Sequence, residues 1–156
     1  EGLAGEALGR GDPPAFHRVT LRCALWSGGA ALVISAVILF GRPVLFPLLT
    51  DLPAVAAVMQ AQGLWLVVMP LASAPSYLLD GVFVGAGATR AMMVTMLGSG
   101  LGVYLPAWYL ARGLGNDGLW LAFLLFNAAR GLSLGACYYL LTRSDRWLRW
   151  SPGPAV

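Results

Sequence analysis

The sequence has few charged residues and, among its basic residues, no lysine. Only 11% of its 156 residues are charged, whereas a soluble domain carries about 25%. This shortage leaves too little polar surface to cover a water-soluble fold. The hydrophobic fraction is 58% and the mean hydropathy is +0.73. The composition therefore predicts a membrane protein.

Histidine and cysteine are also scarce, which argues against a metal or haem site. His17 is the single histidine, and Cys23 and Cys137 lie near the ends of two different apolar runs. A zinc site or a bis-histidine haem site needs more ligands than these. We expect both cysteines to be small apolar helix residues and the protein to have no cofactor.

The signatures of several enzymes and of nucleic-acid binding are missing as well. No Gly-Lys-Ser/Thr follows the glycines near residue 85, and no Gly-x-Ser-x-Gly motif or serine–histidine–acid set is present. The ten arginines give a net charge of only +3 and lie between apolar runs, which is typical of membrane flanks. We therefore expect neither an enzyme nor a nucleic-acid partner.

Four apolar runs are long enough to cross a bilayer, which takes about 20 residues. The predicted fold is an all-α membrane protein with four transmembrane helices, at about residues 23–41, 58–85, 91–111 and 118–142. Residues 1–22 are expected to hold the end of an earlier helix and a turn, with Pro13 or Pro14 opening the helix that enters the first span. Residues 143–156 form a basic tail whose Pro/Gly end is expected to be disordered.

The arginines also predict an orientation. Seven lie on the side that holds the N-terminal segment, the link between spans two and three and the C-terminal tail, whereas Arg42 and Arg112 lie on the other side. The positive-inside rule places the side with seven arginines in the cytoplasm. Both ends of the chain are then cytoplasmic, and Trp147 and Trp150 are expected at the membrane interface.

Asp80 and Arg130 are charged residues inside predicted spans. Asp80 lies ten residues before Arg90, which corresponds to about 15 Å along a helix. Arg130 lies midway between Asp117 and Arg143, so both charges are expected near the middle of a hydrocarbon core about 30 Å thick. Because an unpaired charge is costly there, we predict that the two side chains meet.

Two polar residues share the helical faces of these charges. Tyr77 and Asn127 each lie three residues before their charge and are expected to join its hydrogen-bond network. Two interpretations stay open. The charges form either a permanent ion pair that joins spans two and four, or a site whose carboxylate changes protonation or binds a cation during a cycle. A nearby arginine favours the ionised aspartate, whereas burial favours the neutral form.

Pro70 and Pro75 lie inside the second predicted span. Each removes a backbone donor and collides with the preceding turn, so we expect the helix to kink or open locally. Irregular backbone at this depth is tolerated where protein buries it or water lines it. The prolines therefore mark either a static kink or a moving segment that lines a cavity.

Four stretches carry a family resemblance: EALGRGD, LLDGVFVGAGATRAMM, GNDGLWLAF and NAARGLSLG. They resemble the C-terminal part of multidrug and toxic compound extrusion (MATE) transporters, most closely the branch named for the DNA-damage-inducible protein F. The second stretch, which resembles the tenth helix running into the eleventh, is the most specific. The resemblance covers about residues 1–143 and implies helices nine to twelve of a protein with two six-helix lobes. We therefore interpret the chain, which begins at Glu1, as a fragment.

The resemblance implies a secondary exporter in the bacterial plasma (inner) membrane. Such proteins export cationic or amphipathic compounds in exchange for protons or sodium ions by alternating access. Asp80 matches an aspartate implicated in cation coupling in one branch, whereas the nearest branch has its better-supported coupling carboxylate in the first helix. Arg130 matches an arginine common in that branch. The implied partners are the lipid bilayer, the missing N-terminal lobe of the same chain and a small-molecule substrate.

Other functions compete with this one. A lipid-linked oligosaccharide flippase of the same superfamily would carry more intramembrane charge. A structural or anchoring membrane subunit would use Asp80 and Arg130 only to assemble helices. The lack of membrane histidines disfavours a quinone or haem anchor, and a four-helix small multidrug pump would need a carboxylate in its first span, where this sequence has none.

Overall fold

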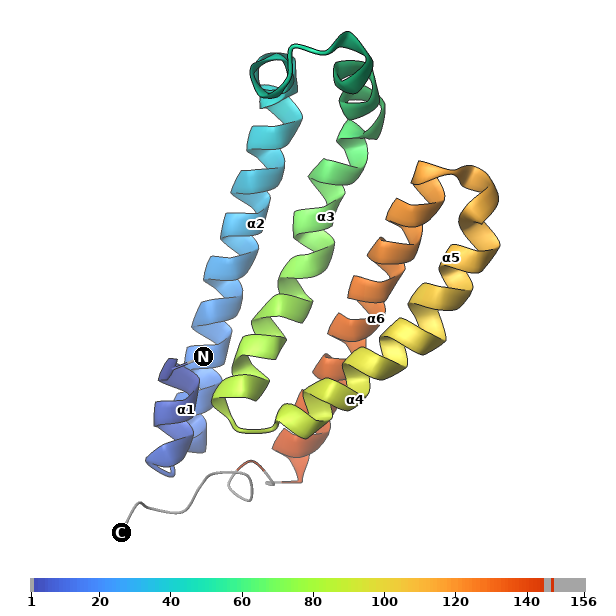
Figure 1. The fold of residues 1–156 in the computed structure, drawn as a ribbon. Coiled ribbons are helices and arrows are strands. Elements are labelled where there is room, and N and C mark those ends of the chain that lie inside the picture. Colours follow the sequence, from blue (N-terminus) through green and yellow to red (C-terminus); the bar gives the residue numbers. More distant parts are fainter. Residues whose placement is uncertain (1, 145–146, 148–156) are drawn as a thin grey trace.

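The computed structural model describes residues 2–144 and residue 147, and nearly all of them are helical (Figure 1). The elements are α1 Gly2–Gly9, α2 Pro13–Leu49, α3 Pro53–Gly85, α4 Thr89–Ser99, the π-helix η1 Gly100–Tyr104, α5 Leu105–Ala111, the 3-10 turn η2 Arg112–Leu114 and α6 Asn116–Arg143. Four helical segments are long and apolar enough to cross a membrane, the third being Thr89–Leu114. The predicted all-α fold with four membrane-length helices is confirmed.

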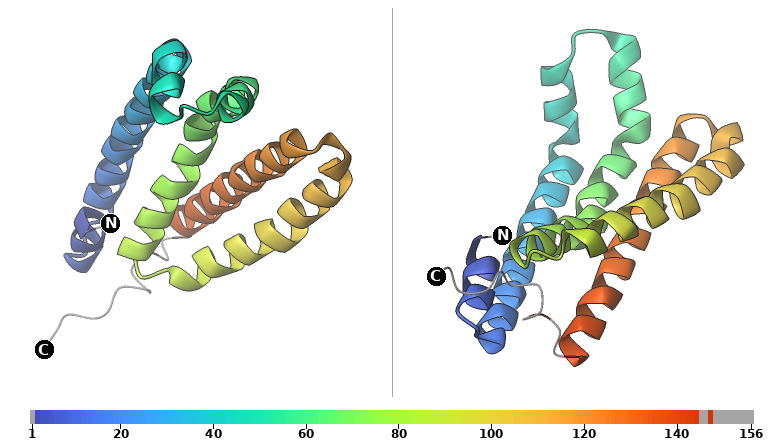
Figure 2. Two further views of the ribbon diagram at one scale, coloured as in Figure 1. Left: turned by 45° about the horizontal axis from the view of Figure 1, so that its top comes forward. Right: turned by 60° about the horizontal axis from the view of Figure 1, so that its bottom comes forward.

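Helix α3 lies between the two halves of the bundle. Helices α2 and α3 run antiparallel side by side, and the segment from α4 to α5 runs antiparallel to α6 (Figures 1 and 2). Helix α3 packs against α2 on one side and α6 on the other, and the short α1 packs against α2 and α3. The link from α3 to α4 is a tight turn in which Gly87 has φ of 72°, a backbone conformation that favours glycine.

Helix α2 is longer at both ends than the predicted span 23–41. It begins as expected with prolines in its first turn, and the Asp12 carboxylate caps it by accepting a hydrogen bond of 2.9 Å from the Ala15 N–H. The predicted span ends at residue 41, but the helix runs on through Pro43 and Pro47 to Leu49. A proline removes one backbone donor, but ending the helix inside apolar surroundings would leave several groups unpaired.

The third membrane-length segment contains a π-helical turn that the sequence pattern did not predict. In this turn, η1, the Leu105 N–H donates to the Gly100 carbonyl five residues earlier, one residue more than in an α-helix. The turn ends at Tyr104, two residues before Pro106, which has no backbone N–H to continue the α-helical pattern. Beyond it, α5 and α6 meet so closely that a Cβ on Gly118 would lie 2.0 Å from the Ala111 carbonyl oxygen.

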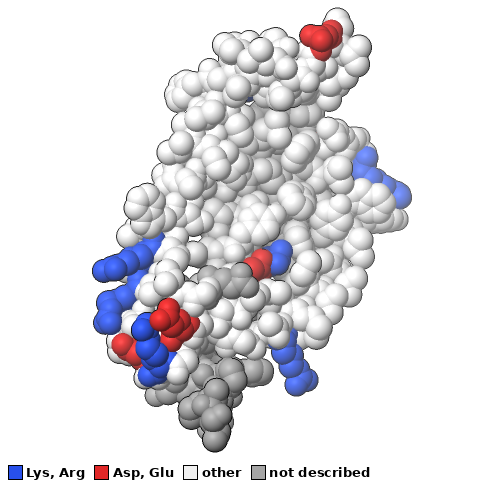
Figure 3. All heavy atoms as spheres, turned by 60° about the vertical axis from the view of Figure 1, so that its left-hand side comes forward, with Lys and Arg blue, Asp and Glu red and all other residues white. Residues whose placement is uncertain are grey.

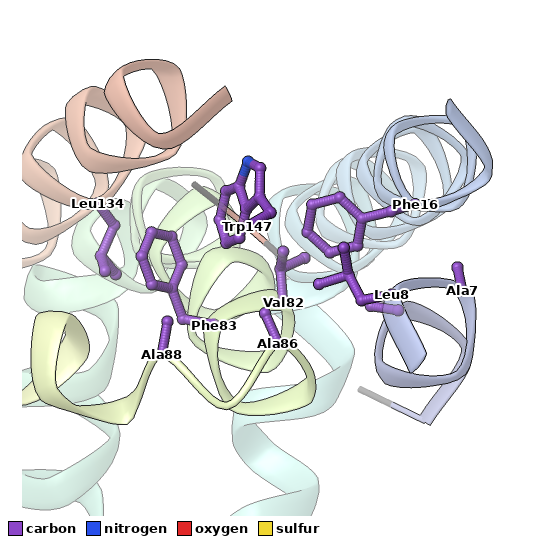
Figure 4. Close-up of a cluster of buried hydrophobic side chains, with 10 residues drawn as sticks. Ala7, Leu8, Phe16, Val82, Phe83, Ala86, Ala88, Leu134 and Trp147 are labelled. Carbon is purple, nitrogen blue, oxygen red and sulfur yellow. The ribbon is translucent and has the colours of Figure 1, made fainter. Parts of the chain in front are cut away.

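An aromatic cluster, formed by Phe16, Phe83, Tyr138 and Trp147, lies at the end of the bundle where α6 finishes. Figure 4 shows Phe16, Phe83 and Trp147 of this cluster. Trp147 is only 1% exposed, and its ring centroid lies 4.9 Å from that of Phe16 and 5.5 Å from that of Phe83. Its indole N–H donates to the Thr142 hydroxyl over 3.0 Å. Trp147 therefore packs inside the bundle instead of standing at the membrane interface as expected. Trp150 and the Pro/Gly end of the tail lie outside the described residues.

Candidate ion-pair site between α3 and α6

The structure brings Asp80 of α3 and Arg130 of α6 into direct contact. The Arg130 Nη2 donates to the Asp80 Oδ2, and the side chains are 10% exposed for Arg130 and 16% exposed for Asp80. In Figure 3, charged atoms gather toward the ends of the molecule, and one red–blue contact breaks the white surface between them. Among residues 2–144 and 147, this is the one ion pair that joins two of the four membrane-length helices.

The two charges lie at different distances from the ends of their helices. Asp80 is five residues before Gly85, where α3 ends, which corresponds to about 8 Å. The estimate of 15 Å from the sequence was too long, because residues 86–88 form a turn and do not extend the helix axis. Arg130 lies thirteen residues before Arg143, the last residue of α6. The pair still forms because α6 extends beyond the end of α3 on that side (Figure 1).

Helical periodicity explains why these side chains face each other. On α3, Ser73, Ser76 and Asp80 recur at spacings of three and four residues, and on α6 Asn127 and Arg130 share a face in the same way. Apart from Asp80, all of these residues are buried. The centre of the contact between α3 and α6 is therefore polar, although the helices around it are apolar.

Asn127 lies beside the pair, but its hydrogen bonds go elsewhere. Its side chain is 1% exposed, its amide nitrogen donates to the Phe123 carbonyl over 3.0 Å, and its amide oxygen lies 3.3 Å from the Ser76 hydroxyl. Ser76 was missed from the sequence, although it lies one turn before Asp80 on the same face. A second polar contact between α3 and α6 thus lies one turn from the ion pair.

The structure does not bring Tyr77 to the pair. Its side chain is 58% exposed, and it makes no hydrogen bond to Asp80 or Arg130. The face of α3 that meets α6 runs through Ser73, Ser76 and Asp80, so Tyr77 lies next to it and points away. A spacing of three residues is compatible with contact but does not decide which side of the helix is buried.

Pro70 and Pro75 lie within α3, which continues as α-helix through both positions. The expected local opening of the helix is not observed. Pro75 cannot donate to the Leu71 carbonyl four residues earlier, so that carbonyl loses its usual partner. Pro75, and not Pro70, lines open grooves on both sides of α3, one of about 300 Å³ toward α2 and one of about 350 Å³ toward α6.

Two polar atoms of the pair have no hydrogen-bond partner among the described residues. They are the second carboxylate oxygen of Asp80, Oδ1, and the Nε of Arg130. Buried polar atoms are satisfied in most proteins, so each of these has capacity for a further ligand or proton. The part of the chain that the structure describes contains no group of three or more histidine, cysteine, aspartate or glutamate residues placed to hold a metal ion together.

Comparison with known proteins agrees with this architecture. The family model described as MatE matches residues 1–110. The chain is 34% identical over 147 residues to DNA damage-inducible protein F of Escherichia coli (strain K12). The alignment covers 94% of this chain and 32% of that protein. The chain thus spans about a third of the length of that relative. No solved structure matches the chain. The match over residues 1–110 is more than half of the chain, and the chain therefore belongs to the MatE family.

Proposed function

We propose that this chain is part of a cation-coupled exporter in which Asp80 takes part in coupling. The observation that supports this most strongly is the state of the Asp80 carboxylate. One oxygen is paired with Arg130, and the other, Oδ1, is buried without a partner among residues 2–144 and 147. A free oxygen can accept a proton or bind a cation before the contact with Arg130 breaks, which a fully satisfied carboxylate cannot do.

Charge neutralisation at Asp80 would change the contact between α3 and α6. A proton or a sodium ion on the carboxylate weakens its attraction for Arg130, and in surroundings of low dielectric constant that loss is large. The coupling ion would in this way alter how firmly α3 is held against α6. Such a change in helix contact is what an alternating-access cycle requires at an ion site.

The remaining parts of the proposal concern orientation and substrate. The distribution of arginines supports an orientation with both ends of the chain in the cytoplasm of a bacterial cell. The substrate class is cationic or amphipathic compounds, as the family resemblance implies. The other lobe of the transporter would come from the part of the protein that corresponds to the remaining length of the relative.

The test compares wild type with Asp80→Asn in the complete protein, expressed in a strain that lacks other efflux pumps. Asp80→Asn should abolish dye efflux while the membrane abundance stays near that of wild type, because asparagine can still accept from Arg130 but cannot titrate. Asp51→Asn is the matched control, because Asp51 is exposed in the link between α2 and α3. Unchanged efflux at equal abundance would refute the coupling role.

A structural role for the pair is the second candidate, and the burial of both side chains favours it. In that case Asp80→Asn and Arg130→Gln would lower abundance and efflux in parallel. The ratio of efflux to abundance therefore separates the two candidates.

A further inference from the structure

The Asn127 amide oxygen and the Ser73 carbonyl oxygen both contact the Ser76 hydroxyl, and the carbonyl is the closer acceptor. The Ser76 hydroxyl lies 2.9 Å from the Ser73 carbonyl oxygen and 3.3 Å from the Asn127 Oδ1. A hydroxyl has a single proton, and hydrogen bonds between oxygens are best at about 2.7–2.8 Å. When the proton lies on the Ser73 carbonyl, the Asn127 Oδ1 is a buried acceptor without a donor.

Arg130 has the opposite shortage, because it has more hydrogen-bond donors than the described residues offer acceptors. A guanidinium carries five N–H donors, and the described contacts satisfy the one that reaches Asp80, while Nε is buried without a partner. Asn127 and Arg130 are three residues apart on the same face of α6, so their side chains are neighbours. Both are buried, at 1% and 8% exposure. An acceptor with only a long contact to its donor, and a donor without a partner among the described residues, thus lie within one helical turn.

We propose that the Asn127 amide oxygen is a second acceptor for Arg130, used when Asp80 no longer offers a negative charge. With Asp80 ionised, Arg130 pairs with it, and Asn127 keeps its weak contact with Ser76. With Asp80 neutral or absent, the guanidinium turns toward the Asn127 Oδ1, and the Ser76 hydroxyl stays on the Ser73 carbonyl. Asn127 is a positioning residue in this arrangement, since it acts on Asp80 only through Arg130.

The physical reason is the cost of a buried cation without a partner. Removing one member of a buried ion pair leaves the other charge uncompensated, which is strongly unfavourable. A hydrogen bond to a charged group is stronger than one between neutral groups, so an amide oxygen offsets part of that cost. The use of this acceptor in a transport cycle rests on the proposed coupling role of Asp80. The hydrogen-bond switch itself does not.

The test is a set of double mutants in the complete protein, purified in detergent and followed by thermal unfolding, so that no transport is measured. Asn127→Ala should lower the unfolding midpoint by at least about twice as much in an Asp80→Ala background as in wild type, because it then removes the last partner of Arg130. Ser76→Ala should cost less in the Asp80→Ala background than in wild type, since Asn127 has left Ser76 there.

Ser133→Ala is the matched control, because the Ser133 hydroxyl bonds to the Arg130 carbonyl and leaves the guanidinium untouched. Its effect should be equal in both backgrounds. In addition, Asn127→Asp should restore part of the midpoint lost by Asp80→Ala, by giving Arg130 a carboxylate one turn away. If Asp80→Ala does not yield folded protein, Asp80→Asn replaces it in every pair. The effects of Asn127→Ala should then still differ between the two backgrounds, but by less, because asparagine offers Arg130 a neutral acceptor.

Equal effects of Asn127→Ala in both backgrounds, or no recovery with Asn127→Asp, would overturn the proposal. The unfolding midpoints test the second acceptor for Arg130, whereas dye efflux by Asp80→Asn tests the coupling role of Asp80. Either proposal can therefore be refuted while the other is supported.

Discussion

At the scale of single residues, the molecule depends on how one buried arginine is neutralised. Arg130 is 8% exposed and contacts Asp80 across the interface between α3 and α6. Removing one partner of a buried pair costs about 3–5 kcal/mol, because the other charge stays behind. Arg130 therefore needs an acceptor in the folded protein, whether or not Asp80 also carries a coupling ion.

Charge exchange tests the pair directly. Asp80→Arg and Arg130→Asp should each reduce membrane abundance severely, because each places two like charges in contact, whereas the double variant should regain a large part of the loss. Quantitative immunoblotting of membrane fractions checks this. A double variant no more abundant than the worse single variant would contradict direct pairing.

The pair itself could be predicted from the sequence, because two opposite charges inside apolar spans have few other ways to be satisfied. The contact of Ser76 with Asn127 could not be predicted, since a serine in a membrane helix commonly donates a hydrogen bond to the backbone of its own helix and carries no charge to mark it. Tyr77 was assigned to the network by spacing alone, and the packing of α3 on α6 left it on an exposed side. The charges of Asp80 and Arg130 were thus sufficient to predict the ion pair. The hydrogen bonds around the pair depend on which face of α3 packs against α6, which the sequence did not show.

At the scale of elements, the approach of α6 to α3 is set by a small residue. A Cβ placed on Gly131 would lie 3.6 Å from the Ser76 backbone nitrogen and 3.7 Å from the Pro75 Cβ, both ordinary contact distances. There is room for a methyl group at this contact, whereas atoms beyond it would have to turn aside from α3. This is how a small residue allows helices to pack closely in a membrane.

We therefore predict a steep dependence on side-chain size at Gly131. Gly131→Ala should be tolerated, whereas Gly131→Leu should destabilise the protein by about 1–3 kcal/mol through overpacking and push Arg130 away from Asp80. Thermal unfolding of the purified complete protein is the measurement. Gly81→Leu serves as control, because nothing lies within 4 Å of a Cβ at that position. Similar losses for the leucine variants at both positions would contradict the close approach.

The bounds of the elements were predicted less well than their number. Charged residues were used to mark the ends of the spans, but Arg18, Arg22 and Arg42 all lie inside α2. A long arginine side chain can reach toward the polar layer while its backbone stays helical, so a charge marks the membrane edge and not the helix end. The prolines inside α2 and α3 likewise do not interrupt these helices, because an open turn at membrane depth would leave backbone groups without hydrogen bonds.

At the scale of the whole molecule, composition was sufficient to predict the fold class. A chain with 11% charged residues and four long apolar runs has few alternatives to a helical membrane bundle. Sequence alone did not place Trp147, which is separated from the last predicted span by a polar segment. Its position depends on three aromatic residues brought together from α2, α3 and α6 by the fold.

The orientation of the bundle makes a prediction for the complete protein. After replacement of Cys23 and Cys137, a cysteine introduced at Asn116 should react with a membrane-impermeant maleimide in intact cells, and one at Thr89 should react only after lysis. Both positions are exposed in the structure, whereas the neighbouring Ala88 is buried and would report poorly. The opposite labelling pattern would refute an orientation with both chain ends in the cytoplasm.

The π-helical turn at Gly100–Tyr104 has a consequence for how this gene can change. A π-helix holds one residue more than an α-helix over the same contacts, so deleting one residue there leaves an α-helix whose two ends keep their relative rotation. A single deletion in α6 would instead turn everything that follows by about 100° and carry the buried face outward. Among the described membrane-length helices, the third is thus the one in which an in-frame loss of a single codon can be absorbed locally.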